Sequence, residues 1–356
     1  MVAQAATGPL RVQHLHVGGG SPDILTAPDV RGLIDHLRGR FAFASDIEFA
    51  VEIDPRAADP AMIEAWARSG ATRASIGVQD FDPPVQQAIN RHQSVDCTAQ
   101  AMAALRAAGI SRINIDQLYG LPRQTVASVQ ETTKRIVALG PDRIALFGYA
   151  HVPWLKPHQR LIDARTLPDG EQRWAQFEAA ANLLRGAGYL WIGLDHFARP
   201  DDPLAIASTA HGLRRNFQGY TIDRCDALVG LGASAIGAPP RGYVQNAVAF
   251  KDYARAIRAG GLPIARGIAL SADDRQRRAI IERLMCELRV DLSTLASPGE
   301  FAWELERLDG MARDGLVERT GPRIVITEQG RPFMRAICAV FDRYLATGVG
   351  RHSRAV

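Results

Sequence analysis

The sequence has few cysteines, and none of them lies near another along the chain. Cys97, Cys225, Cys286 and Cys338 are 128, 61 and 52 residues apart. These separations match no zinc or iron–sulfur spacing and no small disulfide framework. We therefore expect free thiols, which are typical of a protein in the reducing cytoplasm.

Long hydrophobic runs and a strong excess of one charge are absent as well. No stretch of about 18 apolar residues occurs, and residues 1–17 contain no basic segment leading into an apolar one. The net charge is only +4, so composition indicates no basic face for nucleic acid but leaves room for an acidic ligand. We expect a cytoplasmic protein that binds neither membranes nor nucleic acids.

The 356 residues, 47% of them hydrophobic, are enough for one large core and a smaller second one. In the first two thirds of the chain, short apolar runs alternate with helical periodicity, a pattern typical of parallel strands joined by helices. The expected strands are Val12–Val17, Ile47–Ile53, Arg73–Val78, Arg112–Asp116, Arg143–Phe147 and Leu190–Leu194. The expected helices include Asp29–Leu37, Thr98–Ala108, Thr125–Leu139 and Gly170–Ala187. Residues 1–265 are therefore predicted to form an α/β domain, a (β/α) barrel or part of one.

Residues 266–356 have a different pattern, which predicts a mostly helical, winged-helix-like module. Helices are expected at Asp273–Val290 and Glu300–Asp314, a strand pair at Gly315–Glu318 and Arg323–Thr327, and a last helix through Arg335 and Phe341. DNA binding is one hypothesis for such a module. Packing or covering a substrate fits equally well, because the last helix carries apolar residues rather than a basic reading surface.

Polar residues stand where the expected strands of the barrel end. A glycine triplet follows the first strand, and Glu52, Gln79 and Asp116 end later strands. In barrels of this kind the chemistry collects at the carboxyl ends of the strands. Glycines let a ligand approach backbone N–H groups, and a carboxylate in the barrel mouth needs a hydrogen-bonding or charged partner. Capping of the following turns is the structural alternative for each residue.

Four motifs in order carry a family resemblance. They are Gly18-Gly19-Gly20-Ser21-Pro22, Glu52-Ile53-Asp54-Pro55, Gly77-Val78-Gln79-Asp80-Phe81 and Asp116-Gln117-Leu118-Tyr119-Gly120-Leu121-Pro122. Together with Phe147–His151, Gly193–Ala198 and Arg214–Tyr220, they resemble the oxygen-independent coproporphyrinogen III oxidase (coproporphyrinogen dehydrogenase) branch of the radical S-adenosylmethionine enzymes. The similarity runs from about Leu15 to Tyr344.

The resemblance implies an oxidoreductase of haem biosynthesis. In that family a 5′-deoxyadenosyl radical removes hydrogen from two propionates of coproporphyrinogen III, and each then loses carbon dioxide to leave a vinyl group, giving protoporphyrinogen IX. Two S-adenosylmethionine molecules are implied, together with an electron-donor protein; a monomer is expected. Carried over by position, the S-adenosylmethionine contacts are Gly19, Gly20, Ser21, Glu52, Gln79, Arg91, Asp116, Ala150 and Ile236. No residue is assigned a catalytic role.

Two positions of the motifs depart from the family pattern, and one carried-over contact has two interpretations. Ser21 stands where relatives usually have threonine and keeps the hydroxyl, whereas Gln117 replaces a usually apolar residue. Arg91 is interpreted either as a bidentate partner of a ligand carboxylate or as one half of a salt bridge.

The family also implies a [4Fe-4S] cluster held by a Cys-x3-Cys-x2-Cys run. None of the four cysteines has that spacing, so no metal ligand is predicted, and the first barrel strand with its cluster loop is expected to be missing. Three explanations stay open: an incomplete sequence of an active enzyme, an unstable degenerate protein, or a non-catalytic binder of tetrapyrrole or S-adenosylmethionine. A haem chaperone that shares the barrel motifs is the alternative function.

Arg214 and Arg215, beside Phe217 and Tyr220, suit a tetrapyrrole that carries four propionates. Guanidinium groups hold carboxylates, and aromatic rings can lie against pyrrole rings. The structural alternative is a pair of arginines at an element end with aromatics in the core. His151 and His196 are further candidates for polar contacts in the cavity, although structural histidines are common near strand ends.

Overall fold

The computed structural model describes residues 10–345 and divides the chain into two compact units. One unit covers Val12–Ala210, and the other begins at His211. The functional domain division expected at residue 265 is not tested by this packing and stays a prediction.

The unit Val12–Ala210 is built on a seven-stranded sheet with the order β1-β2-β3-β4-β5-β7-β6. Its strands are β1 (Arg11–Val17), β2 (Ala42–Ile53), β3 (Arg73–Gln79), β4 (Arg112–Tyr119), β5 (Arg143–Gly148), β6 (Leu190–Ile192) and β7 (His196–Ala198). Strands β2 to β5 pair in parallel, and β7 pairs antiparallel with both β5 and β6. The prediction of a partial (β/α) barrel is confirmed.

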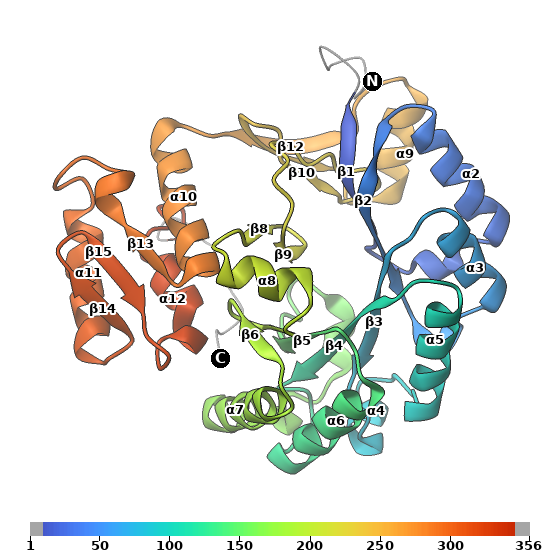
Figure 1. The fold of residues 1–356 in the computed structure, drawn as a ribbon, viewed down its shortest axis with the longest axis horizontal. Helices are drawn as coiled ribbons and strands as arrows, with labels where there is room; N and C mark the ends of the chain where they lie inside the picture. Colours follow the sequence, from blue (N-terminus) through green and yellow to red (C-terminus); the bar gives the residue numbers. More distant parts are fainter. Residues whose placement is uncertain (1–9, 346–356) are drawn as a thin grey trace. The chain divides into compact units, whose positions relative to one another are not determined.

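Helices connect the parallel strands and lie along the outer side of the curved sheet (Figure 1). They are α2 (Ala27–Arg38), α3 (Pro60–Arg68), α4 (Pro83–Ala88), α5 (Val95–Ala107), α6 (Val126–Leu139) and α7 (Gly170–Gly186), which leads from β5 to β6; α8 (Pro203–Thr209) follows β7. Local sequence explains where they begin. Asp59 caps α3 by accepting a hydrogen bond from the Ala61 amide, and Pro60 takes the first helical position, where no amide donor is needed.

The two faces of this sheet differ in polarity because successive strand residues point to opposite sides. The residues that face the helices are fully buried and apolar; they include Val51, Ala74, Ile76, Ile113 and Ile115. On the other face, polar residues are neighbours in register: Glu52 lies opposite Ser75, and Ser75 opposite Asn114. The inner face of the curved sheet is therefore the polar one.

The expected strand Leu190–Leu194 is wrong as a single strand. The segment ends in a tight hairpin in which β6 and β7 pair, with Gly193 in the left-handed region at φ 53°. The Trp191 indole donates to the Leu194 carbonyl across the turn. A continuous apolar run does not distinguish a strand from a strand followed by a turn.

The second unit contains several short sheets. Its first part consists of the hairpin β8 (Arg214–Asn216) and β9 (Gly219–Thr221), the sheet β10 (Ile236–Gly237), β11 (Gly242–Asn246) and β12 (Ile264–Ala269), and helix α9 (Phe250–Arg258). Its second part consists of α10 (Ala272–Glu287), β13 (Arg289–Asp291), α11 (Ala302–Arg313), β14 (Val317–Thr320), β15 (Arg323–Ile326) and α12 (Met334–Ala339). The expected helical C-terminal part is confirmed.

The helix expected to reach Val290 ends earlier. Leu288 is left-handed at φ 58° and closes α10 after Glu287, and Val290 then joins β13, which pairs with β15. Strands β13, β15 and β14 form an antiparallel sheet beside the helices. Helical periodicity continues through these residues in the sequence, but pairing with a strand some 35 residues away decides their structure.

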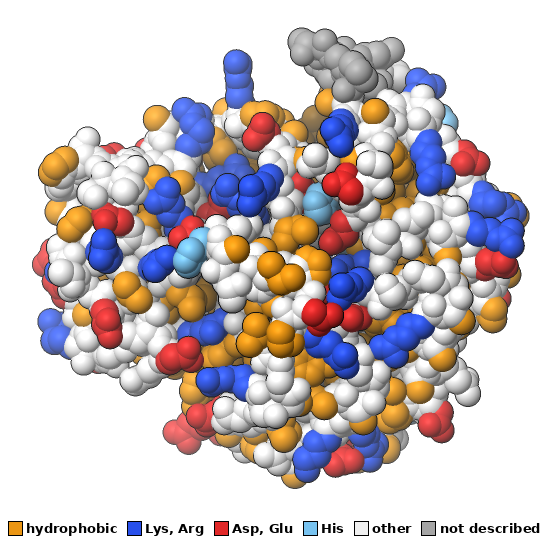
Figure 2. Space-filling model, viewed as in Figure 1, with side chains coloured by type: hydrophobic (Ala, Val, Ile, Leu, Met, Phe, Trp, Pro, Cys, Tyr) orange, Lys and Arg blue, Asp and Glu red, His pale blue; other side chains and the backbone are white. Residues whose placement is uncertain are grey.

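No helix within residues 10–345 is both long and apolar enough to cross a membrane. On the face drawn in Figure 2, arginine and lysine side chains are interspersed with aspartate and glutamate. This distribution matches the small net charge of the sequence. The expectation that the protein does not bind nucleic acid stays a prediction.

Candidate functional site

The glycine turn after β1 is open on one side. Gly19 and Gly20 have φ of 76° and 97°, which side-chain-bearing residues rarely adopt, and a Cβ built on either would meet nothing within 4 Å. The glycines are thus needed for the backbone conformation and not to avoid a packing clash. Ser21 follows, and its hydroxyl donates to Asp23 at 3.1 Å. A ligand can approach the backbone of this turn closely.

Glu52 on β2 fastens the glycine turn to the sheet. One carboxylate oxygen accepts the Gly19 amide at 3.1 Å, and the other lies 3.1 Å from His16 Nε2. The His16 hydrogen bond, supported by the Gly19 amide, lowers the pKa of Glu52 against the effect of partial burial. The side chain is still 43% exposed. An ionised, reachable carboxylate of this kind can accept hydrogen bonds from hydroxyl or ammonium groups.

Asp116 on β4 lies deeper on the same face. Asn114 Nδ2 donates to its carboxylate at 2.8 Å, and the Ser75 hydroxyl lies 3.4 Å away. Burial raises the pKa of Asp116; the hydrogen bond from Asn114 opposes the rise and the negative charge of Glu52 adds to it. Because the Asn114 amide and the Ser75 hydroxyl are both neutral, a cationic or hydroxyl-bearing ligand would stabilise the ionised form of Asp116 further.

The register extends this polar row to β7. Asp116 lies opposite Ala145 on β5, and Ala145 lies opposite His196 on β7. The His196 ring contacts Asp195 at 2.8 Å, and its charge lowers the pKa of Asp116 against the dominant effect of burial. His196, a candidate from the sequence, thus lies near a second candidate, Asp116.

Gln79 occupies an unusual backbone conformation at the end of β3. Its φ is 68°, and the pairing with β4 shifts register between Gly77 and Gln79. A left-handed non-glycine residue costs about 1–2 kcal/mol. The Gln79 amide nitrogen lies over Gly77, where an added Cβ would be only 2.9 Å from it. Backbone strain of this kind clusters at binding and active sites.

Arg91 forms a salt bridge within the protein. Its guanidinium donates to both carboxylate oxygens of Asp54, at 3.3 and 3.4 Å, and to the Gly77 carbonyl at 2.7 Å. Although burial opposes the shift, hydrogen bonds from Arg56 and the charge of Arg91 lower the pKa of Asp54. The Nε of Arg91 has no hydrogen-bond partner among the described residues. Of the two interpretations of Arg91, the structure shows the salt bridge, with Asp54. Contact of Arg91 with a ligand carboxylate stays a prediction.

Two carried-over positions, Ala150 and Ile236, and the motif residue Gln117 have other surroundings. Ala150 follows β5, and its carbonyl accepts a hydrogen bond from Gln159 Nε2 at 3.0 Å. Ile236 lies on β10 and belongs to the unit that begins at His211. Gln117 is fully buried on the helix side, where its amide nitrogen donates to the Thr133 hydroxyl at 2.8 Å. This hydrogen bond explains how a polar residue is tolerated at a usually apolar position.

Several polar residues of the site were not among the candidates from the sequence. His16 stands two positions before the glycines. Strand alternation could not place His16 on the same face as Glu52, because the register between the two strands is not known from the sequence. Ser75 and Asn114 were part of predicted strands without an assigned role. Arg173 on α7 donates to the Tyr149 carbonyl at 2.9 Å and lies over the Tyr119 ring. Its position depends on helix packing, which no local motif indicates.

The described residues fit an adenosyl ligand better than a metal cluster. Within residues 10–345 no three His, Cys, Asp or Glu side chains come together as metal ligands. Cys97 is half-buried and Cys225 exposed, whereas burial raises the pKa of the Cys286 and Cys338 thiols to about 12. Conversely, the open glycine turn and two acidic groups suit the backbone-donor and hydroxyl contacts that S-adenosylmethionine needs.

Comparisons with known proteins agree with this geometry. Residues 1–136 match the model of the Radical SAM superfamily. The chain is 48% identical over 361 residues to an oxygen-independent coproporphyrinogen III oxidase of Bradyrhizobium diazoefficiens, covering all of this chain and 80% of the relative. A Synechocystis relative of the same name is 40% identical, covering 94% and 74%.

A solved structure has the same fold over nearly the whole chain. It is that of the coproporphyrinogen III oxidase of Escherichia coli, described as a radical SAM enzyme. The TM-score is 0.90 at 39% identity, and the match covers 94% of this chain and 78% of that one.

Proposed function

We propose that this chain, which belongs to the family of oxygen-independent coproporphyrinogen III oxidases, binds S-adenosylmethionine on the polar inner face of its sheet. Members of the family are radical S-adenosylmethionine oxidoreductases of haem biosynthesis. The bound S-adenosylmethionine would serve the conversion of coproporphyrinogen III to protoporphyrinogen IX. The observation that carries this proposal is the row of Glu52, Asp116 and their neighbours beside an open glycine turn.

The family implies S-adenosylmethionine and a [4Fe-4S] cluster, which together supply the radical chemistry that turns propionate side chains into vinyl groups with loss of carbon dioxide. The part of the chain that the structure describes brings together no set of cluster ligands. The chain's own residues are therefore assigned to binding and orienting the ligand, and no step is assigned to iron.

The glycine turn and Glu52 bind the polar end of the ligand. The free side of Gly19 and Gly20 admits a carboxylate or ribose group to the backbone, and Glu52 accepts hydrogen bonds from its hydroxyl or ammonium groups. The His16 contact fixes the Glu52 side chain so that less rotational freedom is lost when the ligand binds.

Asp116 and Gln79 hold a second part of the ligand. A hydrogen-bond donor of the ligand would stabilise the ionised form of the buried Asp116 carboxylate. Gln79 presents its side-chain amide from a strained strand end. Arg91 supplies the guanidinium Nε, which is unpaired among the residues that the structure describes. With Ser21, Ala150 and Ile236 these residues are the proposed contacts of two S-adenosylmethionine molecules.

Several finer points belong to the same proposal. The substrate is a tetrapyrrole, and reduction requires an electron-donor protein. We infer a monomer in the cytoplasm, where the free thiols of the described cysteines stay reduced. The haem-chaperone alternative gains no support from the named relatives, which are oxidases.

The test is calorimetric titration of the folded 356-residue protein with S-adenosylmethionine. We expect saturable binding, and about tenfold weaker binding by Glu52→Gln, because a hydrogen bond to a charged group is lost. Glu64→Gln is the matched control, since Glu64 is an exposed glutamate of α3 paired with Arg68 one turn later. A folded protein that does not bind, or a Glu52→Gln variant that binds as tightly as Glu64→Gln, would overturn the proposal.

A further inference from the structure

The unit that begins at His211 contains a cavity of about 780 Å³. It is lined by side chains of β8, β10, β11, β12 and α10 and by residues near position 342. The volume lies within the roughly 300–1,000 Å³ of small-molecule sites. All lining residues belong to this one unit.

Part of the wall is apolar and includes exposed aromatic surface. Phe217 and Tyr243 meet edge to face, with ring centroids 5.2 Å apart. Phe217 is 53% exposed, and Ile268 on β12 is 42% exposed. Exposed aromatic and aliphatic side chains around a cavity are typical of a site for a large apolar ligand.

The cavity also holds five arginines, of which two are neutralised within the protein. Arg277 pairs with Asp273 at 2.9 Å and with Glu304 at 2.7 Å. Arg343 pairs with Asp273 at 2.6 Å. These two arginines have structural partners.

The other three, Arg215, Arg266 and Arg278, have no ion pair among the described residues. Arg266 donates to the Gln245 side chain at 2.7 Å, and Arg278 lies over the Tyr243 ring. Arg215 lies over the Tyr220 ring at 4.5 Å, and its Nη1 is buried with no hydrogen-bond partner in this part of the chain. A buried guanidinium donor without an acceptor is costly, and an incoming carboxylate would satisfy it.

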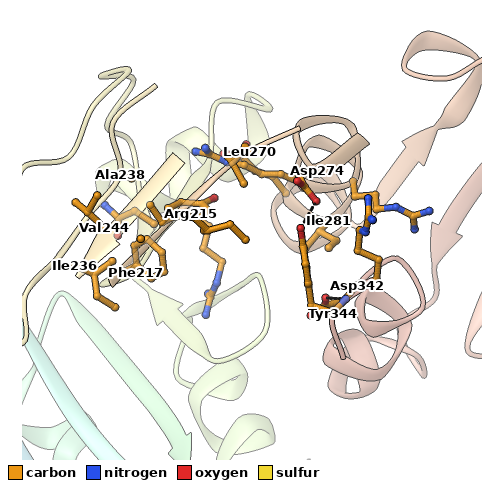
Figure 3. A pocket seen from close by; sticks show the side chains of 18 of the residues that line it. Arg215, Phe217, Ile236, Ala238, Val244, Leu270, Asp274, Ile281, Asp342 and Tyr344 are labelled. Carbon is orange, nitrogen blue, oxygen red and sulfur yellow. Dashed lines mark hydrogen bonds between the residues drawn. The ribbon is translucent and has the colours of Figure 1, made fainter. Parts of the chain in front are cut away.

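The acidic residues that line the cavity form no ion pair with these three arginines among the described residues. Asp274 accepts the Tyr344 hydroxyl at 2.9 Å, a bond drawn in Figure 3. Asp342 accepts the Tyr344 amide, and Glu282 lies 3.7 Å from Arg214. Figure 3 shows Arg215 between the apolar group of Phe217, Ile236 and Val244 and the group around Asp274 and Tyr344. The lining residues thus carry more arginines than carboxylates beside an apolar wall.

We propose that this cavity binds the propionate-bearing tetrapyrrole through Arg215, Arg266 and Arg278, with Phe217 and Tyr243 against its rings. The inference rests on the proposed function, which supplies a substrate with four carboxylates. Guanidinium forks match carboxylate geometry, and the aromatic rings cover the apolar macrocycle. It also revises the interpretation from the sequence: Arg214 faces Glu282, and the buried Tyr220 donates to the Met285 carbonyl.

The test uses fluorescence titration of the 356-residue protein with coproporphyrin III, the stable oxidised form of the substrate, and with its tetramethyl ester. We expect the tetra-acid to bind at least tenfold more tightly than the ester and to bind more weakly at high salt. Arg215→Gln, Arg266→Gln and Arg278→Gln should each weaken tetra-acid binding about tenfold and leave ester binding unchanged.

Arg258→Gln is the matched control, since Arg258 is an exposed arginine of α9 outside the cavity. The Arg266 and Arg278 side chains are exposed, so their variants stay informative even if Arg215→Gln is unstable. Equal binding of acid and ester, or three variants that behave like Arg258→Gln, would overturn the inference.

The outcomes separate this inference from the proposed function. If S-adenosylmethionine binds as proposed and coproporphyrin III does not, the cavity is not the tetrapyrrole site and the inference falls alone. If coproporphyrin III binds through the three arginines while S-adenosylmethionine does not bind, the cavity assignment is supported and the proposed role of the sheet face falls.

Discussion

Two charged clusters occupy the same sheet, one at the amino ends of its strands and one toward their carboxyl ends. At the amino ends Arg73 and Arg143 begin β3 and β5 and meet the fully buried Asp202 at 3.6 and 2.7 Å. Toward the carboxyl ends, Glu52 and Asp116 face neutral groups, a histidine and open space. The first cluster is closed, and the second can accept a ligand.

The difference separates stability from function within one fold. The amino-end cluster is an internally paired group in which burial, with repulsion from Arg73, lowers the pKa of Arg143 to about 10. Losing the Asp202 carboxylate would leave the buried Arg143 without its ion-pair partner and Arg73 with Glu48 alone, at 3.6 Å. The carboxyl-end face holds a strained residue and a carboxyl group with a raised pKa. Barrel folds generally keep stability and chemistry at opposite ends in this way.

The largest expected effect is on the closed cluster. Asp202→Asn should lower the free energy of unfolding by about 3–5 kcal/mol, because it removes the ion-pair partner of the buried Arg143 and one of the two carboxylates beside Arg73. Urea denaturation measures the change. Asp201→Asn is the neighbouring control: Asp201 is 73% exposed and lies 3.6 Å from Arg112, so its change should stay within about 0.5 kcal/mol. Equal effects of the two variants would contradict the comparison.

The second prediction concerns the open face. Asp116→Asn should weaken S-adenosylmethionine binding about tenfold, because an acceptor of a charge-assisted hydrogen bond is lost. Unlike Asp202→Asn, it should not lower stability at pH 7, since burial disfavours the ionised form of Asp116. Calorimetry and thermal unfolding of both variants give the comparison. An Asp116→Asn protein that loses stability but keeps full affinity would make this face structural.

Third, Gln79→Gly should stabilise the protein and weaken binding together. Relief of the left-handed strain, about 1–2 kcal/mol, exceeds the entropic cost of glycine, about 0.5–1 kcal/mol. The side-chain amide proposed to contact the ligand is lost. Arg123→Gly is the control, because Arg123 has a similar φ of 63° in an exposed loop. It should gain similar stability without loss of affinity; a similar loss of affinity in both variants would argue against a contact by Gln79.

The smallest expected effect is on the pH dependence of stability in two variants. Thermal unfolding between pH 7 and pH 3 measures it. The pKa of Glu52 is lowered in the folded protein, so the ionised side chain stabilises the fold at pH values above its unfolded pKa, near 4.5. This stabilisation is lost as the pH falls through the folded pKa. Glu52→Gln should therefore be slightly less stable than the natural protein at pH 7, by less than about 1 kcal/mol because the side chain is partly exposed, and equal to it at low pH.

Asp116 should show the opposite sign. Its pKa is raised above 3.8, so ionisation costs stability as the pH rises through the folded pKa. Asp116→Asn should be the more stable protein at pH 7, and the difference should vanish toward pH 3. Profiles of the same sign for the two variants would show that their environments do not differ as described.

Local sequence predicted much of the sheet and the named residues of its open face. Apolar runs and glycines located the parallel strands, and Glu52, Gln79 and Asp116 could be found because each ends a run that alternates or is continuously apolar. The hairpin of β6 and β7 could not be separated from a single strand, since the turn at Gly193 interrupts no apolar pattern. The early end of α10 depends on pairing between β13 and β15, which is distant in the sequence.

The closed cluster and the cavity arginines were harder to predict for a different reason. Arg73, Arg143 and Asp202 are far apart in the sequence and meet only through the packing of three elements. Likewise, Arg266 and Arg278 join Arg215 around one cavity only after β12 and α10 have folded. The Arg214–Arg215 pair was visible as a motif, but the ion pair of Arg214 with Glu282 and the place of Arg215 in the cavity lining appear only in the folded unit.

The most direct test of the central claim is a crystal structure of the 356-residue protein with S-adenosylmethionine. We predict electron density for the ligand on the inner face of the sheet, with its polar groups within hydrogen-bonding distance of Glu52, Asp116 and the Gly19–Gly20 backbone. Density elsewhere on the chain, or an ordered ligand that contacts none of these groups, would contradict the account.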